Sequence, residues 1–287
     1  MLKVAIIGGR GQLGRAISEA AADSTNSYVA YDEKEADILN IESLRCALQG
    51  VDIVINCAAY TNVEAAEDDI TMAYRVNSEG IATLSKVCSE QGTRLIHIST
   101  DYVFGGDTSR NTPYTEEDSV APINIYGKSK AEGETMALSN SDAVVIRTAW
   151  LYAPWSKNFC RTIYSLSATQ PELRVVDDQR GTPTSALSLA RLLVDVIDSG
   201  KLSTMHGIYH YTDSGECSWY DFASAIVELS GHNCQVLPCR SSERPTRAKR
   251  PHYSVLSKQR LTTETNTTLR PWHDALVEVI NRIKSEL

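Results

Sequence analysis

Tyr126 and Lys130 are the residues whose types and spacing first point to chemistry. They lie four positions apart in the segment INIYGKSKAEGE, so on a helix their phenol and ammonium share one face. A nearby cation stabilises the phenolate and lowers the pKa of a tyrosine, which can then act as a general acid toward a carbonyl oxygen. The same spacing also fits a solvated pair on a helix surface, so the rest of the chain has to decide between the two interpretations.

A glycine-rich segment follows the first apolar run of the chain, residues 2–7. Gly8, Gly11 and Gly14 lead into a helical pattern over residues 15–22, which is the order of strand, turn and helix that a dinucleotide-binding unit needs. Glycines permit a tight turn and close approach of the backbone to a pyrophosphate. The N-terminus of the helix then offers unpaired amides to that anion.

Acidic residues follow the second predicted strand, residues 28–31. Asp32 comes directly after it, and an acid at this point commonly accepts hydrogen bonds from the ribose hydroxyls of an adenine nucleotide. A carboxylate that caps a loop is the alternative interpretation. Asp37 and Ile38, a little farther along, could border the adenine.

Strands and helices alternate through the first half of the chain. We expect further strands at residues 51–57, 94–99 and 143–148. We expect helices at residues 41–49, 65–69, 72–90, 159–168, 186–199, 219–230 and 272–284. The alternation predicts an α/β fold with a doubly wound parallel sheet, in which ligands bind at the carboxyl ends of the strands. Several residues with suitable side chains or backbone fall at or just beyond such ends: Gly11, Asp32, Ala59, Thr100 and Trp150.

Composition narrows the class of protein. A net charge of -8 over 287 residues argues against nucleic acid as a partner, because phosphate contacts need a basic surface. No secretory leader and no apolar stretch long enough to span a membrane are evident. The seven cysteines never occur in a Cys-x-x-Cys spacing and the histidines lack metal-ligand spacing, so we expect free thiols, a cytoplasmic location and no metal.

Several segments together resemble one family from end to end. These are GGRGQLGR, CAAYTNVEAAE, HISTDYVFGG, PINIYGKSKAEGE, IRTAWLY, VVDDQRGTPT and KRPHYSVL. They resemble the extended branch of the short-chain dehydrogenase/reductase family and, within it, the dTDP-4-dehydrorhamnose reductases. The resemblance implies a Rossmann-type domain over residues 1–151, with residues 184–200 packing back on it. Residues 152–287 would form mainly a smaller lobe that binds a sugar nucleotide.

The activity that this resemblance implies is NAD(P)H-dependent reduction of the C4 ketone of dTDP-4-dehydro-L-rhamnose, which yields dTDP-L-rhamnose for cell-envelope polysaccharide. Two alternatives stay open. One is reduction of another nucleotide-linked 4-keto-6-deoxysugar. The other is a regulatory role without catalysis, since the regulatory subunit of methionine adenosyltransferase resembles the same branch.

The resemblance also implies a role for individual residues. Tyr126 would donate the proton to the C4 carbonyl, Lys130 would lower the Tyr126 pKa and hold the nicotinamide ribose, and Thr100 would hydrogen-bond the reacting oxygen. The residues expected around the dinucleotide are Gly8, Gly11, Gln12, Leu13, Gly14, Asp32, Asp37, Ile38, Ala58, Ala59, Tyr60, Tyr126 and Lys130. The residues expected around the sugar nucleotide are Thr100, Asp101, Trp150, Asn158, Arg180 and Arg250. For Asn158 and the two arginines, a surface position with ion pairs is the alternative.

Some positions limit what can be carried over. Asp32 would repel a 2′-phosphate and so favours NADH, whereas Arg10 and Arg15 near the glycine segment could accommodate NADPH; both cofactors stay open. Some family members form a magnesium-bridged dimer through a glutamate on the first helix. The matching position here is Ala16, so we expect no metal and either a monomer or a homodimer. His97 lies within a predicted strand and is interpreted as a core histidine.

Overall fold

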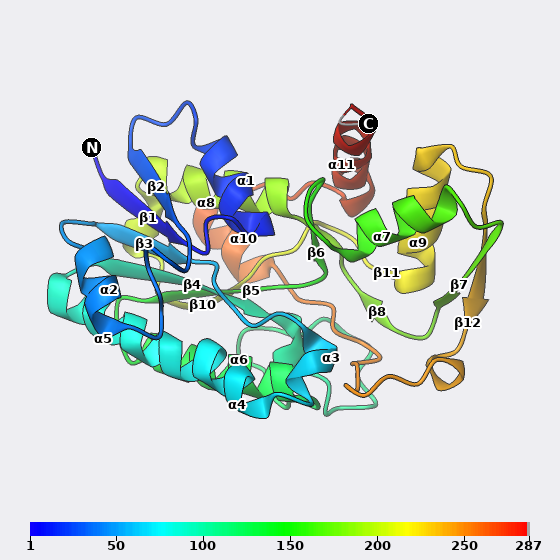
Figure 1. The fold of residues 1–287 in the computed structure, drawn as a ribbon, viewed down its shortest axis with the longest axis horizontal. Coiled ribbons are helices and arrows are strands. Elements are labelled where there is room, and N and C mark those ends of the chain that lie inside the picture. Colours follow the sequence, from blue (N-terminus) through cyan, green and yellow to red (C-terminus); the bar gives the residue numbers. More distant parts are fainter. Residues whose placement is uncertain (286–287) are drawn as a thin grey trace.

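A parallel six-stranded sheet forms the centre of the protein, seen in a computed structural model that describes residues 1–285 (Figure 1). The strands are β1 (Lys3–Ile7), β2 (Ser27–Tyr31), β3 (Ile53–Asn56), β4 (Arg94–Thr100), β5 (Val144–Thr148) and β10 (Gly207–His210). Their order is β10-β5-β4-β3-β1-β2, and every neighbouring pair is parallel. The predicted doubly wound parallel sheet is therefore confirmed.

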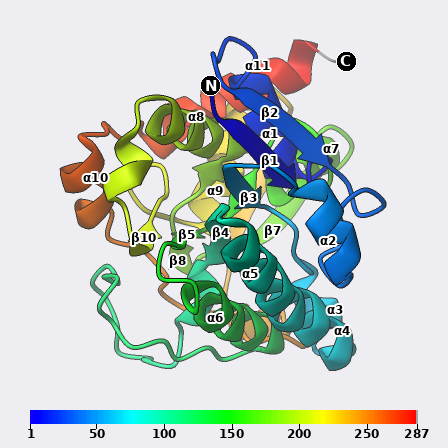
Figure 2. The ribbon, with the colours of Figure 1, turned by 90° about the vertical axis from the view of Figure 1, so that its left-hand side faces the viewer.

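Helices cover both faces of this sheet (Figure 2). On one face lie α1 (Gln12–Ala20) and α8 (Ala186–Asp198), which pack against each other. On the other face lie α2 (Ile41–Ala47), α5 (Gly80–Gln91) and α6 (Ile125–Leu138). Each face has its own apolar core, because side chains of a strand point alternately to the two sides. Ile6 belongs to the first core, for example, and Ile7 to the second.

The sixth strand, β10, contains Tyr209 and His210, which are interpreted from the sequence as packing in a strand, but it was not expected as part of the main sheet. It has only four residues and one branched apolar side chain, Ile208, so its pattern alone does not place it there. It is fixed as a strand by parallel pairing with β5. The main sheet therefore takes one strand from beyond residue 151, and α8 also packs on it. The division into domains at residues 151 and 152 stays a prediction.

The helix expected over residues 72–90 is present, but it contains a π-helical turn. It runs from α4 (Ile70–Tyr74) through the π-helical turn (Arg75–Glu79) into α5, and the short helix α3 (Val63–Ala66) precedes it near the helix expected at residues 65–69. The turn has a packing reason: the buried Asn77 side chain bonds both the N–H and the C=O of Tyr60, at 2.8 and 3.1 Å. A continuous α-helix would not aim Asn77 at that loop, and π-turns of this kind are frequent near functional sites.

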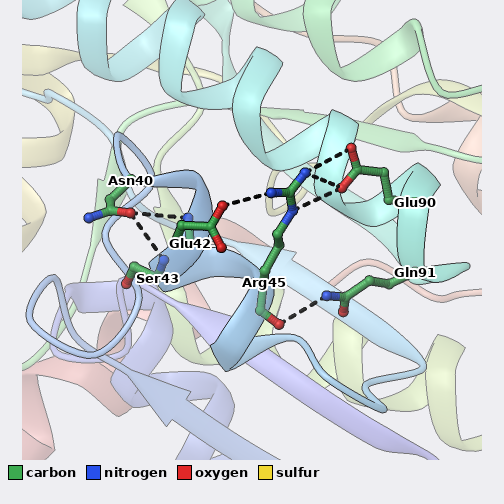
Figure 3. A network of polar contacts seen from close by, with 6 residues as sticks. All are labelled: Asn40, Glu42, Ser43, Arg45, Glu90 and Gln91. Carbon is green, nitrogen blue, oxygen red and sulfur yellow. Dashed lines mark hydrogen bonds and ion pairs between the residues drawn. The ribbon is translucent and has the colours of Figure 1, made fainter.

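The outer surface between α2 and α5 carries an ion-pair network (Figure 3). The Arg45 guanidinium contacts Glu42 at 2.7 Å and Glu90 at 3.0 Å, and Asn40 caps α2 by accepting from two backbone N–H groups. These exposed contacts join the two helices, and none of the residues in the network lines the cavity at the carboxyl ends of the strands.

The rest of the chain builds a smaller lobe at one end of the sheet (Figure 1). Its helices are α7 (Phe159–Ser167), α9 (Trp219–Ser230) and α11 (Trp272–Ser285), whereas α10 (Gln259–Thr265) packs beside β10 at the edge of the main sheet (Figure 2). Its short strands are β6 (Leu151–Tyr152), β7 (Glu172–Val176), β8 (Arg180–Gly181), β9 (Thr184–Ser185), β11 (Cys217–Ser218) and β12 (Gln235–Cys239). Within residues 1–285 no helix has the length and apolar character to cross a membrane.

Candidate active site

A cavity of about 760 Å³ lies along the carboxyl ends of the central strands. Ile7 at the end of β1, Thr100 at the end of β4 and Thr148 at the end of β5 contribute to its wall. Residues of the smaller lobe, such as Phe159 of α7, close the opposite side. Parallel strands bring their carboxyl ends to one edge, and the lobe covers that edge, so the fold itself creates the cavity.

The glycine segment forms one wall of this cavity. Gly8, Gly11, Gln12 and Leu13 line it, whereas Gly14 does not. Gly8 has a φ of +78°, and a Cβ there would lie 2.8 Å from the backbone N of Ala58, so glycine is needed for this turn. Residue Gly14 serves helix packing instead, as a Cβ there would lie 2.5 Å from the Gly8 carbonyl oxygen.

All but one of the residues expected around the adenosine line the cavity. Asp37, Ile38, Ala58, Ala59 and Tyr60 all line the cavity. The exception among the expected adenosine residues is Asp32, which lies outside the lining.

The carboxylate of Asp32 forms an ion pair with Arg10 at 2.7 Å and accepts from the Lys34 backbone N–H at 2.9 Å. These contacts are those of a carboxylate that caps a loop, and contact of Asp32 with a ribose stays a prediction. The neighbouring Glu33, which the sequence did not single out, lines the cavity instead.

Thr100, Tyr126 and Lys130 line the same cavity. Thr100 ends β4, while Tyr126 and Lys130 lie on the first turns of α6. The helix begins there because Asn124 caps it, accepting from the Gly127 N–H at 2.7 Å. Gly127 also lets the helix approach the turn after β4 closely, since a Cβ would lie 2.1 Å from the Tyr102 carbonyl oxygen.

Burial is the largest cause of the pKa shifts of Tyr126 and Lys130. It raises the pKa of Tyr126 to about 12, which an interaction with Thr100 opposes and the Asp101 carboxylate reinforces. It lowers the pKa of Lys130 to about 8, against the attraction of Glu134 and Cys57. Lys130 is not among the causes of the Tyr126 shift. That Lys130 lowers the Tyr126 pKa stays a prediction.

Asp101 is buried beside these groups. Its carboxylate accepts from the Ser254 hydroxyl at 2.6 Å and from the Thr100 hydroxyl at 3.1 Å. Burial raises the pKa of Asp101 to about 7, although these hydrogen bonds oppose the shift. Ser254 was missed from the sequence as a site residue, since it lies far along the chain in KRPHYSVL and nothing in its spacing links it to Asp101.

Aromatic side chains form the wall on the side of the smaller lobe. Trp150 lines the cavity and stacks on Trp219, with ring centroids 3.5 Å apart. Trp150 has a φ of +47°, a strained conformation for a bulky residue, and Gly181 leaves room for its ring. Trp219 also lines the cavity but was interpreted only as the start of a helix.

The three polar residues expected near the diphosphate or the base differ in position. Asn158 and Arg250 line the cavity, whereas Arg180 lies outside it in an ion pair with Glu216 at 2.9 Å. Asn158 caps α7 and also donates to the Gln12 side chain at 2.9 Å, which joins the lobe to the glycine segment. Arg250 pairs with Glu64 at 2.9 Å, yet its buried Nε has no partner among the described residues.

His97 is fully buried, as expected for a core residue. Its ring nevertheless contacts Lys130, with Nε2 3.3 Å from the lysine Nζ. No sequence pattern indicates this contact. Among residues 1–285, no cluster of three or more His, Cys, Asp or Glu side chains could hold a metal ion. Ala16, on α1, is buried in the first core.

Comparisons with known proteins agree with this geometry. The family model described as RmlD substrate binding domain matches residues 2–285. A dTDP-4-dehydrorhamnose reductase of Mycolicibacterium smegmatis is 39% identical, over 97% of this chain and 85% of that protein. A crystal structure of a dTDP-4-dehydrorhamnose reductase from Clostridium acetobutylicum is 39% identical with a TM-score of 0.93, covering 99% of this chain and 100% of that one. The Bacillus anthracis reductase, solved in complex with NADP, is 33% identical with a TM-score of 0.91, covering 98% and 99%.

Proposed function

The chain belongs to the RmlD substrate binding domain family, and on this premise we propose that it reduces the C4 ketone of dTDP-4-dehydro-L-rhamnose with NADPH or NADH. The product is dTDP-L-rhamnose, a precursor of cell-envelope polysaccharide. The observation that carries the proposal is the meeting of Thr100, Tyr126 and Lys130 with the glycine segment in one cavity.

The residues present fit a dinucleotide. The α1 helix begins after Gly11 without a side-chain cap and without an acidic residue in its first turn, so its N–H groups can bind a pyrophosphate. Gly8 keeps the turn close to Ala58, where any larger residue would collide. Gly8, Gly11, Gln12 and Leu13 would hold the pyrophosphate, with Asp37, Ile38, Ala58, Ala59 and Tyr60 on the adenosine side.

The protein's own part in the reduction is orientation and proton delivery. When bound, the cofactor supplies a hydride, so negative charge grows on the ketone oxygen. Tyr126 donates its proton to that oxygen, and the Thr100 hydroxyl hydrogen-bonds the same atom. A phenol whose pKa is about 12 keeps its proton until the oxygen becomes basic enough to take it. Lys130 holds the nicotinamide ribose.

The sugar nucleotide is proposed to lie on the lobe side of the cavity. Trp150, Asp101, Asn158 and Arg250 line the cavity, and the positive charge of Arg250 supports a contact with the diphosphate. Arg180, outside the cavity and paired with Glu216, has no observation in favour of substrate contact. A cytoplasmic location and a monomeric or homodimeric state stay predictions from the sequence.

The test is a direct assay. The purified protein is mixed with NADPH or NADH and dTDP-4-dehydro-L-rhamnose generated in place, and the loss of reduced-cofactor absorbance is followed. Oxidation of cofactor and formation of dTDP-L-rhamnose support the proposal. Oxidation only with a different 4-keto-6-deoxysugar nucleotide would move the chain to the second substrate class. Cofactor binding without oxidation of any such substrate would favour a regulatory role.

A further inference from the structure

A row of buried polar groups runs from the loop after β3 to Lys130. Asn56, the last residue of β3, lies beside His97 of β4 in the parallel register, and neither side chain is exposed. The Asn56 Oδ1 accepts from the Ala58 backbone N–H at 3.2 Å, and its Nδ2 lies 3.1 Å from His97 Nδ1. His97 Nε2 then lies 3.3 Å from the Nζ of Lys130.

The backbone N–H of Ala58 fixes the direction of this row. It can only donate, so the Asn56 oxygen must face it; with the amide reversed, two donors would meet. The Asn56 NH₂ group therefore faces Nδ1 of His97, which has to accept. A neutral imidazole carries one N–H, and that proton must then be on Nε2, pointing at Lys130.

The last contact is satisfied by only one form of the lysine. An ammonium has three donors and no acceptor, so it would oppose the Nε2–H of His97, whereas a neutral amine can accept it. Either form can donate to the Ile98 carbonyl oxygen, 2.6 Å from Nζ. We propose that His97 is a positioning residue for Lys130, and that the Ala58–Asn56–His97 row donates to Nζ and so favours the neutral amine.

The charged and titratable groups that face Lys130 allow this. Glu134, one turn later on α6, favours the ammonium, but its carboxylate is already paired with Arg147 at 2.7 Å. Cys57, after β3, stays a neutral thiol because burial raises its pKa to about 12. On β4, His97 stays neutral, since burial first and Lys130 second depress its pKa well below the ordinary value. Tyr126 lies one turn earlier on α6 and keeps its proton.

The consequence of this inference for activity rests on the proposed function, but the experiments that test the inference do not. A reduction that needs a charged Lys130 loses rate as the pH rises through the lysine pKa, about 8 here. The row would then set the upper pH limit of activity. Asn56, which orients the row, touches neither cofactor nor substrate in the proposed arrangement. A substitution that reverses the direction of the hydrogen bonds in this row should extend activity to higher pH.

The first experiment reads the tautomer of His97 directly. Two-bond ¹H–¹⁵N spectra of ¹⁵N-histidine-labelled protein distinguish Nε2–H from Nδ1–H, and the His97 signals are assigned by their absence in His97→Gln. The spectra are recorded above about pH 8, where Lys130 is mostly the neutral amine, and there we expect Nε2–H in the unchanged protein. In Asn56→Asp both oxygens can only accept, so the proton should move to Nδ1. An Nδ1–H tautomer in the unchanged protein would overturn the proposal whether or not the protein is a reductase.

The second experiment follows Lys130 by the ¹³Cε shift of labelled lysine across pH. We expect half-protonation at about pH 8, moved up by about one unit or more in Asn56→Asp. The new carboxylate also attracts the ammonium, so the same substitution in a His97→Phe background measures that attraction alone. A larger shift with His97 present is the coupling expected of the row. Equal shifts in both backgrounds, in variants that melt cooperatively, would contradict it.

Discussion

Tyr126 donates the proton in the proposed reduction, and replacing it by phenylalanine removes only the hydroxyl group. Tyr126→Phe should lower kcat about a hundredfold to ten-thousandfold, the usual contribution of a general acid, while the melting temperature and the cofactor affinity stay unchanged. Turnover is measured by cofactor absorbance and affinity by fluorescence titration. Tyr164→Phe, which removes another mostly buried phenol on α7, is the matched control. Full turnover in Tyr126→Phe would remove this residue from its role.

The choice of cofactor is expected to depend on the Arg10–Asp32 ion pair. The Arg10 side chain is 85% exposed and can leave Asp32 for a 2′-phosphate, whereas the Asp32 carboxylate repels that phosphate. Arg10→Ala should raise KM for NADPH about tenfold with little change for NADH, since a charge-assisted hydrogen bond contributes about 1.5 to 3 kcal/mol and exposure weakens it. Asp32→Asn should lower KM for NADPH instead. Steady-state kinetics with both cofactors decide; parallel changes for NADPH and NADH would exclude this selectivity.

Single residues were predictable where their neighbours in sequence define the chemistry. Tyr126 and Lys130 share a helix turn, and Thr100 ends a recognisable strand, so their meeting in one cavity follows from the parallel sheet. Contacts between distant segments were not predictable. Ser254 reaches Asp101 across 153 positions, and the Asn56–His97 contact depends on a strand register that no local pattern encodes.

At the scale of elements, the catalytic helix α6 is held by close approach to the π-turn. A Cβ at Gly133 would lie 2.0 Å from the Asn77 carbonyl oxygen, so Gly133→Ala must push the two elements apart. We expect a loss of about 1 to 3 kcal/mol in the free energy of unfolding, measured in urea, as is typical of overpacking. Lys128→Ala, on the exposed side of the same helix, should leave it nearly unchanged. Equal stability of the two variants would show that the π-turn shifts without lowering the free energy of unfolding.

The sequence was informative about helices whose ends carry their own signals. The capping box of Ser218 and Asp221 starts α9 where it was expected, and Gly231 ends it in a left-handed conformation. The π-turn was missed because its cause, the bond between Asn77 and the Tyr60 loop, is tertiary. The place of β10 in the main sheet was missed for the same reason, since it follows from pairing with β5.

At the scale of the whole molecule, Asp213 ties the segment after β10 to the start of α8. Its carboxylate accepts from the Ser185 N–H at 2.8 Å, and burial raises its pKa from the ordinary 3.8 to about 7. The folded protein therefore keeps a proton between these two values that the unfolded chain releases. The contribution of this group to stability is complete below about pH 4 and is lost as the pH rises toward 7.

Asp213→Asn keeps the shape of the side chain and removes its titration. The free energy of unfolding of this variant, minus that of the unchanged protein, should therefore increase from pH 5 to pH 8 in urea denaturation. Taking the difference cancels Asp101, whose raised pKa gives the unchanged protein a slope of the same sign. Asp195→Asn, at an exposed position of α8, controls for loss of a negative charge. A difference that is the same at both pH values would mean that Asp213 is already ionised in the folded protein at pH 5, and that its burial is offset by the Ser185 amide and the nearby Arg270 and Lys258.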